Sequence, residues 1–373
     1  MDEHLLLLAR HLDRGQFELL VLTHPTDGPQ THLLAERADI RAIPAPYPPH
    51  AGALTRLAAL RALYRNERID LLHLHSPAAG GQWVPVLAAR LTGVPVAATY
   101  HQVQAIRLPV KTRLINYVIH RWLIASTVAV SRGVKASLAR AAGLPERRIT
   151  VIHNGIDRTE EPRVAAGSPA LPARAPGEVR IGYFGRLSPE KGLAVVLQAL
   201  ANLAVQCPQA HTLIVGDGPE RERLEAITRL LAIEDRVSFL GFRPDARALM
   251  AEVDIIVHTP VYEGFGIVVL EAMAAGRPVV VNDSPGGLTE IVTHGETGLV
   301  VPANSPSALA AALAQLCADP EARRRLGQQG LARYEERFSA RAMAERVAAL
   351  YERSLRGRST AGPGSFEPAV LAR

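Results

Sequence analysis

Short apolar segments alternate with longer helical patterns through most of this chain, and no other feature limits its fold as strongly. In the first half, the predicted strands are residues 17–23, 69–75, 94–100, 127–130 and 149–152, and the predicted helices are residues 3–14, 54–66, 82–92, 111–124 and 131–142. Strands that alternate with helices in this way form parallel, doubly wound sheets. We therefore predict a doubly wound α/β domain over residues 1–160.

The pattern then stops and starts again. Residues 161–178 are rich in Pro, Ala, Gly and Arg without periodicity, which is typical of a linker. Beyond them, predicted strands at 179–184, 211–215, 237–240 and 255–258 alternate with helices at 191–203, 220–231 and 246–251. We predict a second domain over 179–338, a terminal helix at 339–356 that returns towards the first domain, and a disordered tail at 357–373. Two Rossmann-like domains facing a cleft are the expected architecture.

The chain opens with a helical pattern, whereas a doubly wound domain begins with its central strand. The predicted N-terminal domain therefore lacks its first strand. We expect the given start to be internal to a longer reading frame. The alternative is a domain that has lost the middle of its sheet.

The composition is that of a soluble globular protein, with 48% hydrophobic and 21% charged residues. Cys207 and Cys317 have no CxxC partner, which fits a reduced cytoplasm. The early apolar run at residues 5–9 is too short to span a membrane. A net charge of +6 favours anionic partners such as a nucleotide diphosphate or a membrane surface. Nucleic acid is not expected, because no basic patch is interleaved with aromatic residues.

Two glutamates with seven residues between them carry the strongest local signal. Glu263 is followed by Gly264, Phe265 and Gly266, and an apolar helical run leads to Glu271. Backbone N–H groups at the start of that helix form an anion site. Glu263 is placed to contact a sugar hydroxyl, and Glu271 to accept hydrogen bonds from another hydroxyl. The alternative is an ordinary helix with a solvated glutamate at each end.

A glycine loop with two cations follows the first strand of the second half. Gly185 and Arg186 precede a Ser-Pro break, and Lys191 comes five positions after Arg186. A guanidinium and an ammonium that converge at a helix start suit a diphosphate. The alternative is a solvated loop capped by Ser188.

The next strand ends in a second glycine turn at Gly216 and Gly218. The turn resembles half of a dinucleotide fingerprint, but Arg221 stands where the third glycine is expected. An NAD-dependent dehydrogenase is disfavoured, because an acidic ribose anchor about twenty residues further on is also missing. The glycines are expected to let the backbone approach a nucleotide.

Three histidines follow or end predicted strands of the first half. His101 comes after the strand at 94–100, where it is either structural or in contact with substrate. His73 and His75 are expected to point to opposite faces of their strand and so to make a poor metal pair. We therefore predict no metal ligands and no cofactor.

These segments together resemble the retaining glycosyltransferases of the two-Rossmann-domain (GT-B) type, group 1 or family 4. The resemblance covers roughly residues 1–355, and its parts stand in family order at 70–75, 99–101, 128–133, 153–157, 185–192, 215–219, 239–241, 263–276 and 286–298. It implies an acceptor-binding N-terminal domain and a nucleotide-sugar-binding C-terminal domain. It also implies transfer from a UDP- or GDP-sugar to a hydroxyl acceptor without metal, in the synthesis of a cell-surface polysaccharide, glycolipid or glycoconjugate.

The resemblance also assigns roles to residues. Glu263 and His101 are implied to contact the transferred sugar as catalytic residues. The implied donor-binding residues are Arg186, Lys191, Glu271, Gly264, Phe265, Gly266, Gly185, Gly216 and Gly218. The family usually opens with a strand and a Gly-Gly loop, which this sequence lacks. The alternative function is therefore a truncated relative that binds nucleotide or partners without catalysis.

Residues 106–122 combine basic and apolar side chains at helical spacing. One hypothesis is a peripheral membrane helix that collects a lipid-linked acceptor at the inner face of the membrane. The other is an ordinary half-buried helix.

Overall fold

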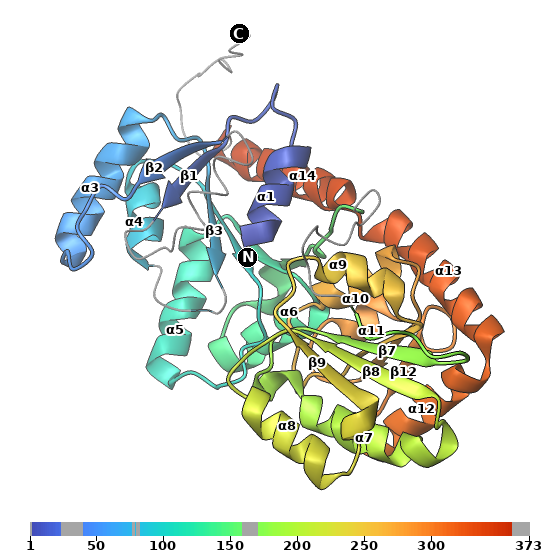
Figure 1. The fold of residues 1–373 in the computed structure, drawn as a ribbon. Coiled ribbons are helices and arrows are strands. Elements are labelled where there is room, and N and C mark those ends of the chain that lie inside the picture. Colours follow the sequence, from blue (N-terminus) through green and yellow to red (C-terminus); the bar gives the residue numbers. More distant parts are fainter. Residues whose placement is uncertain (1, 24–39, 77–78, 80–82, 159–170, 360–373) are drawn as a thin grey trace. The chain divides into compact units, whose positions relative to one another are not determined.

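The computed structural model describes residues 2–23, 40–76, 79, 83–158 and 171–359. Most of the predicted linker, residues 161–170, and the tail from 360 onwards lie outside this set. The chain divides into two compact units, Met1–Gly155 with Ala340–Arg373, and Ile156–Ser339. Figure 1 shows the elements of each unit.

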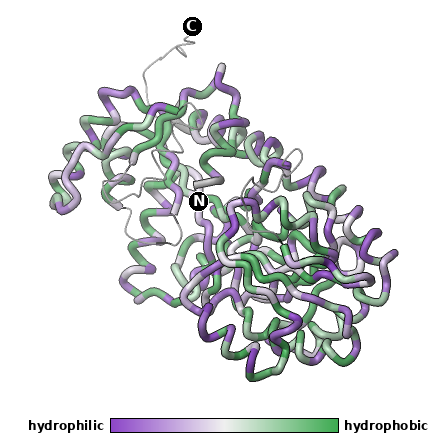
Figure 2. Tube along the Cα trace, in the orientation of Figure 1, coloured by the Kyte–Doolittle hydropathy of each residue, from purple (hydrophilic) through white to green (hydrophobic). Residues whose placement is uncertain are grey.

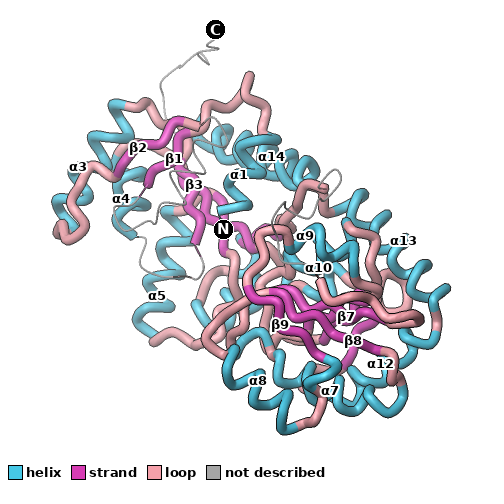
Figure 3. The backbone as a smooth tube through the Cα atoms, viewed as in Figure 1, coloured by secondary structure: helices cyan, strands magenta, loops and turns pink. Residues whose placement is uncertain are grey.

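The first unit contains a parallel sheet in the order β3-β4-β5-β6. Its strands are β3 (Leu72–Ser76), β4 (Val96–Tyr100), β5 (Ser126–Ala129) and β6 (Ile149–Val151). A separate parallel pair is formed by β1 (Leu20–Thr23) and β2 (Arg41–Pro44) (Figure 3). We did not predict β2, because its four residues include an arginine and a proline and form no apolar run.

The helices of this unit include those predicted from its periodicity. They are α1 (Asp2–His11), α3 (Ala53–Asn66), α4 (Trp83–Leu91), α5 (Val110–Val118) with its π-helical continuation η1 (Ile119–Leu123), α6 (Arg132–Ser137) with η2 (Leu138–Ala142), and α14 (Ala340–Ser359). Leu7 and Leu8 of α1 pack in one apolar cluster with Val347 and Tyr351 of α14. Helix α14 therefore belongs to the first unit and continues to Ser359, into the segment predicted as tail.

The second unit is built on a six-stranded parallel sheet in the order β12-β11-β10-β7-β8-β9. The strands are β7 (Val179–Phe184), β8 (Ala210–Val215), β9 (Val237–Gly241), β10 (Ile255–His258), β11 (Val279–Asn282) and β12 (Leu299–Val301). The chain starts at the central strand β7, moves outward to β9, and returns to the other side of β7 as β10. This order is that of a Rossmann fold, with a switch point between β7 and β10. The predicted α/β fold with parallel, doubly wound sheets is confirmed.

Helices cover the second sheet and supply most of its core. They are α7 (Leu193–Gln206), α8 (Arg221–Leu230), α9 (Ala246–Leu249), α10 (Ile267–Ala274), α11 (Leu288–Ile291), α12 (Pro306–Ala318) and α13 (Pro320–Arg337). The core packs α7 and α12 against buried strands, which are coloured as hydrophobic in Figure 2. Strands β7, β10 and β11 are buried along their whole length, and their sequences are mostly apolar, with Arg180, His258 and Asn282 as the polar exceptions. Among the described helices, none combines the length and apolar character needed to cross a membrane.

Candidate active site

The candidate site lies at the carboxyl ends of the two strands that flank the switch point of the second unit. Strand β7 leads into the loop at 185–192, and β10 leads into the loop at 259–266. The crossovers that follow these two strands run in opposite directions, so their loops diverge and leave room for a ligand. Both loops were predicted as functional from the sequence.

The two loops meet through a main-chain hydrogen bond, in which the Val261 amide donates to the Glu190 carbonyl oxygen over 2.9 Å, and through an ion pair. Lys191 Nζ lies 2.7 Å from Glu263 Oε2, and His258 Nε2 lies 3.2 Å from the same oxygen. The side chains of Lys191 and Glu263 keep 24% and 17% of their surface exposed. A ligand can therefore reach both groups, while their surroundings weaken screening by water.

The Glu263 carboxyl group is held in its ionised form. Burial by itself would raise its pKa, but the hydrogen bond from His258 and the charge of Lys191 outweigh burial and lower the pKa to about 2. A carboxylate of this kind accepts hydrogen bonds and does not donate a proton near neutral pH. Its chemistry fits the binding of a hydroxyl group.

His258 is a site residue that the sequence analysis missed. Its side chain is 1% exposed. Because a carboxylate only accepts hydrogen bonds, Nε2 must carry the proton that points to Glu263. Its Nδ1 is buried and has no hydrogen-bond partner within the described part of the chain. The available signal was a histidine ending the otherwise apolar strand β10, five residues before the predicted glutamate.

Glycines let the neighbouring loops pack closely. Gly216 has φ +138°, and a Cβ added there would lie 1.9 Å from the Gly185 carbonyl oxygen. A Cβ at Gly218 would lie 2.3 Å from the carbonyl oxygen of Leu187. These positions therefore require glycine for the β8 loop to lie against the β7 loop.

The backbone of Glu263 is fixed in a similar way. Its amide donates to Pro285 O over 3.1 Å, and its carbonyl accepts from the Gly287 amide over 3.3 Å. A Cβ added at Gly286 would lie 1.6 Å from the Glu263 carbonyl oxygen. The segment after β11 thus holds the glutamate loop through main-chain contacts.

Helix α10 begins directly after the glutamate loop. Gly266 adopts φ +110°, and a Cβ there would lie 2.6 Å from Leu288 Cδ2. The Phe265 ring is buried and lies 6.0 Å from the ring of Phe338, so only the main chain of Phe265 is left to face a ligand. The first amides of a helix have no partner within it and attract anions.

Two other predicted donor-binding side chains, those of Glu271 and Arg186, are not part of the Lys191–Glu263 ion pair. Glu271 Oε1 pairs with Arg247 Nε of α9 over 2.7 Å. Arg186 is exposed and forms no ion pair with any residue in the described ranges. The structure therefore joins Lys191 to Glu263 directly and leaves the Arg186 guanidinium accessible beside the same loop.

His101 belongs to the first unit, where it follows β4. Its Nε2 lies 3.1 Å from Nδ1 of His75. We predicted opposite faces for His73 and His75, and this was wrong, because their rings lie 4.1 Å apart. Residues two apart in a strand share a face, so the spacing places these two side chains together.

Burial keeps these histidines neutral. It lowers the pKa of His101 to about 2 and that of His73 to about 3, and the neighbouring histidines add to the effect. His75 is shifted well below its usual pKa by burial and by His73, His4 and His101. At neutral pH each of these rings therefore carries a nitrogen lone pair, which in His75 and His101 can serve a donor or a metal ion.

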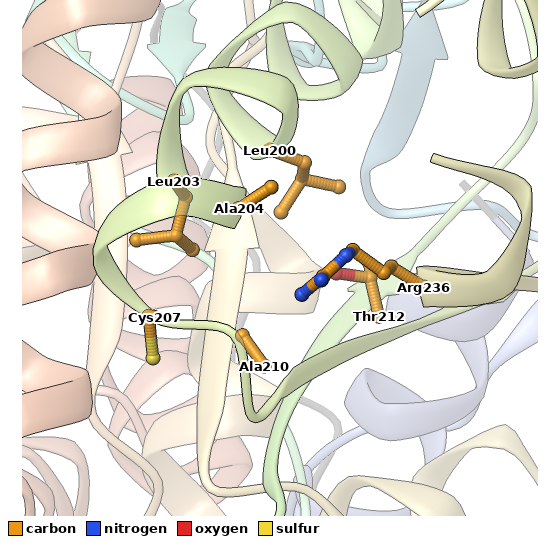
Figure 4. Close-up of a pocket in the computed structure, with 7 residues that line it drawn as sticks. All are labelled: Leu200, Leu203, Ala204, Cys207, Ala210, Thr212 and Arg236. Atoms are coloured by element: carbon orange, nitrogen blue, oxygen red, sulfur yellow. The ribbon is translucent and has the colours of Figure 1, made fainter. Parts of the chain in front are cut away.

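A pocket elsewhere in the second unit is not a candidate for substrate binding. Figure 4 shows its lining, which consists of Leu200, Leu203, Ala204, Cys207, Ala210, Thr212 and Arg236. It lies at the end of α7 and the start of β8, at the amino ends of the strands. Ligands of doubly wound sheets bind at the opposite edge. We interpret it as a small gap in core packing.

Two family models match the chain. The model of group 1 glycosyl transferases matches residues 172–333, and that of glycosyltransferase family 4 matches residues 1–160. A 2-deoxystreptamine glucosyltransferase from Streptomyces kanamyceticus is 30% identical over 328 residues, which are 82% of this chain and 82% of the relative. A glycogen synthase from Mycobacterium tuberculosis is 31% identical over 306 residues, or 79% and 71% of the two chains.

Solved structures show the same architecture. A glycosyltransferase from Rickettsia africae superposes with a TM-score of 0.81 at 20% identity and covers 95% of both chains. Anabaena HepE, solved with UDP, superposes with a TM-score of 0.76 at 25% identity and covers 94% of this chain and 96% of its own. The chain belongs to the group 1 glycosyltransferases and has their GT-B fold.

Proposed function

We propose that this glycosyltransferase moves a sugar from a nucleoside diphosphate sugar to a hydroxyl acceptor with retention of configuration at the anomeric carbon. The observation that carries the proposal is the pairing of Lys191 with Glu263 across the switch point. One loop offers a cation to the diphosphate, and the other offers a carboxylate to the sugar. The resemblance to UDP-bound HepE supports a nucleotide at this edge of the sheet.

In this proposal the second unit holds the donor. Lys191 and the exposed Arg186 bind the diphosphate oxygens, and the amides at Gly264, Phe265 and Gly266 face the same charge. Glu271 binds the ribose, exchanging its ion pair with Arg247 for hydroxyl groups. The glycine turns at Gly185, Gly216 and Gly218 bring the main chain close to the nucleotide. These roles follow the motif order of the family and are supported by the loop geometry above.

The proposed reaction needs no metal for charge stabilisation. The bond between the anomeric carbon and the departing phosphate oxygen breaks, and the acceptor oxygen bonds to that carbon from the same face. The acceptor proton passes to the departing phosphate oxygen. Lys191 stabilises the negative charge that develops on the diphosphate, and Glu263 orients the sugar through a hydroxyl. His101 of the first unit is proposed to contact the donor sugar as well.

The nucleotide is proposed to be uridine diphosphate, with GDP as the alternative. HepE has been solved with UDP and with UDP-glucose, which supports this choice. The proposed setting is the synthesis of a cell-surface polysaccharide, glycolipid or glycoconjugate in the cytoplasm. Both cysteines are free, as expected there.

A donor screen by thermal unfolding tests the proposal. UDP at one hundred times its dissociation constant is expected to stabilise the protein by about 2.7 kcal/mol, and GDP at the same concentration by less. The Lys191→Ala protein should lose most of the response. If neither nucleotide, nor any UDP- or GDP-sugar, raises the melting temperature, the assignment of the second unit as donor-binding is wrong.

A membrane-bound acceptor is supported by the surface of α5 and η1. Several large apolar side chains of residues 106–122 are exposed, whereas Leu108 and Ile119 are half-buried. The exposed ones are Ile106, Val110, Leu114, Ile115, Tyr117, Val118 and Trp122. Arg107 and Lys111 are exposed among them, and the Arg121 guanidinium lies 4.4 Å from the Trp122 ring centroid. Apolar side chains interleaved with cations suit the headgroup region of an anionic bilayer. We propose that this surface rests on the inner face of the membrane.

Flotation with vesicles tests the membrane surface. The wild-type protein should float with vesicles containing anionic lipid at low salt and less at high salt. Leu114→Asp with Trp122→Ala should reduce binding about tenfold or more, because each buried apolar side chain contributes roughly 1.5–3 kcal/mol. Leu230→Asp is the matched control, since Leu230 is also exposed but lies on α8. If the double variant floated as well as Leu230→Asp, the surface of α5 and η1 would not be the membrane-binding surface.

A further inference from the structure

Three histidines from separate elements of the first unit converge on one point. His4 lies on α1, His75 on β3, and His101 just beyond β4. One ligand atom from each can be chosen so that all three lie within 4.8 Å of one another. The ring of His4 lies 5.1 Å from that of His75 and 4.9 Å from that of His101, between centroids.

His4 lacks the partners that a buried imidazole needs. Both its ring nitrogens are buried, and neither forms a hydrogen bond of normal geometry with a residue that the structure describes. The side chain of Asn154 is near enough to counteract in part the lowering of the His4 pKa by burial. Leaving such ring nitrogens buried and unsatisfied is unfavourable. The position therefore calls for a ligand that accepts an imidazole lone pair or donates to it.

The other two rings already stand at metal-binding separation. His75 Nδ1 and His101 Nε2 lie 3.1 Å apart. Two nitrogens bound to one tetrahedral zinc at about 2.0–2.1 Å are roughly 3.3–3.4 Å apart. The ligand nitrogen of His4 lies within 4.8 Å of the other two and would supply the third corner.

We propose that His4, His75 and His101 bind a zinc ion in the first unit. Imidazole nitrogens suit zinc and its transition-metal neighbours, whereas magnesium and calcium require oxygen ligands. His73 is not a fourth ligand, because its two nitrogens are used by Tyr351 Oη at 2.6 Å and Thr99 Oγ1 at 2.8 Å. It packs against the ring of His75 and fixes its orientation.

The zinc ion would tie α1 to the carboxyl ends of β3 and β4. That link stabilises the first unit and is separate from the diphosphate-binding residues, which all belong to the second unit. An imidazole binds zinc through one nitrogen, so the other nitrogen of His101 is left for the proposed contact with the donor sugar. The zinc ion would thus be structural and would take no part in stabilising charge in the proposed reaction.

Metal binding is tested on the full chain after removal of metals with a chelator. Zinc is expected to bind at about one equivalent and to raise the melting temperature. Cobalt(II) should give the intense visible absorption of a tetrahedral site. His4→Ala and His75→Ala should each weaken zinc affinity by roughly 100-fold or more, because loss of even an outer-shell partner costs 10–100-fold.

Two control variants distinguish zinc binding at these three histidines from binding elsewhere on the chain. His50→Ala removes an exposed histidine and should bind zinc like the wild type, and so should Lys191→Ala, which alters only the donor site. If His4→Ala fails to fold, the cobalt spectrum of the wild-type protein decides. No uptake of zinc, an octahedral cobalt spectrum, or uptake that is unchanged in both His4→Ala and His75→Ala would overturn the proposal. Binding of UDP is measured in the separate thermal-unfolding screen, and its result does not depend on whether zinc binds.

Discussion

Lys191→Ala is expected to lower turnover by about 10²–10³-fold. The Lys191 ammonium group is partly buried and lies at the switch point, where the proposed diphosphate gains charge as the sugar departs. Removing one preorganised electrostatic contact of this kind costs about 3–4 kcal/mol of transition-state stabilisation. Steady-state kinetics with the donor found in the screen gives the measurement, and the effect should be seen in kcat as well as in kcat/KM.

Arg186→Ala is expected to have an effect of the same size, because the proposed diphosphate is held by both cations. Arg229→Ala is the matched control, since it removes an exposed arginine of α8 and should leave turnover unchanged. The melting temperature of each variant without ligand shows whether the fold is intact. Wild-type turnover in both Lys191→Ala and Arg186→Ala would remove the assignment of the diphosphate site.

Most of the second unit could be predicted from its sequence, because its sheet is parallel and covered on both faces. Strands such as β7 and β10 are then short, mostly apolar segments bounded by glycines and polar residues, which differ clearly from the helices between them. Strand β2 of the first unit was missed for the opposite reason. Within the described part of the chain it pairs with β1 alone, and its residues are exposed or half-exposed, so no apolar run marks it.

The site could be predicted only as a set of separate motifs. Lys191 and Glu263 are 72 positions apart, and their contact follows from the placement of β10 beside β7. Strand order is a property of the whole sheet and cannot be read from either motif alone. The role of His258 depends on the same placement, since a histidine that ends an apolar strand gives no local sign of its partner.

The histidines of the first unit show a different limit. The error over His73 and His75 was one of geometry, because alternation along a strand puts every second side chain on the same face. With that corrected, the sequence places these two rings together. The approach of His4 still could not be predicted, since it depends on how α1 packs against α14 and the sheet.

Glu263→Gln is expected to lower transfer by about 10²–10³-fold while leaving UDP affinity equal to or tighter than that of the wild type. The carboxylate is ionised through His258 and Lys191, and the neutral amide is a weaker acceptor for the sugar hydroxyl. The same change releases Lys191 from its ion pair and frees its charge for the diphosphate. Calorimetry with UDP and initial rates of transfer measure the two effects separately.

Glu271→Gln provides the matched control because it neutralises the second glutamate of the same segment. Since Glu271 is proposed to bind the ribose, this variant should weaken UDP binding, by about fivefold or more for the loss of a hydrogen bond worth roughly 1 kcal/mol. Relative to the wild type, the affinity for UDP is thus expected to be equal or higher in Glu263→Gln and lower in Glu271→Gln. If Glu263→Gln weakened UDP binding and transferred sugar normally once saturated, the carboxylate would belong to the nucleotide site. The sugar would then have to be bound by residues other than those of the glutamate loop.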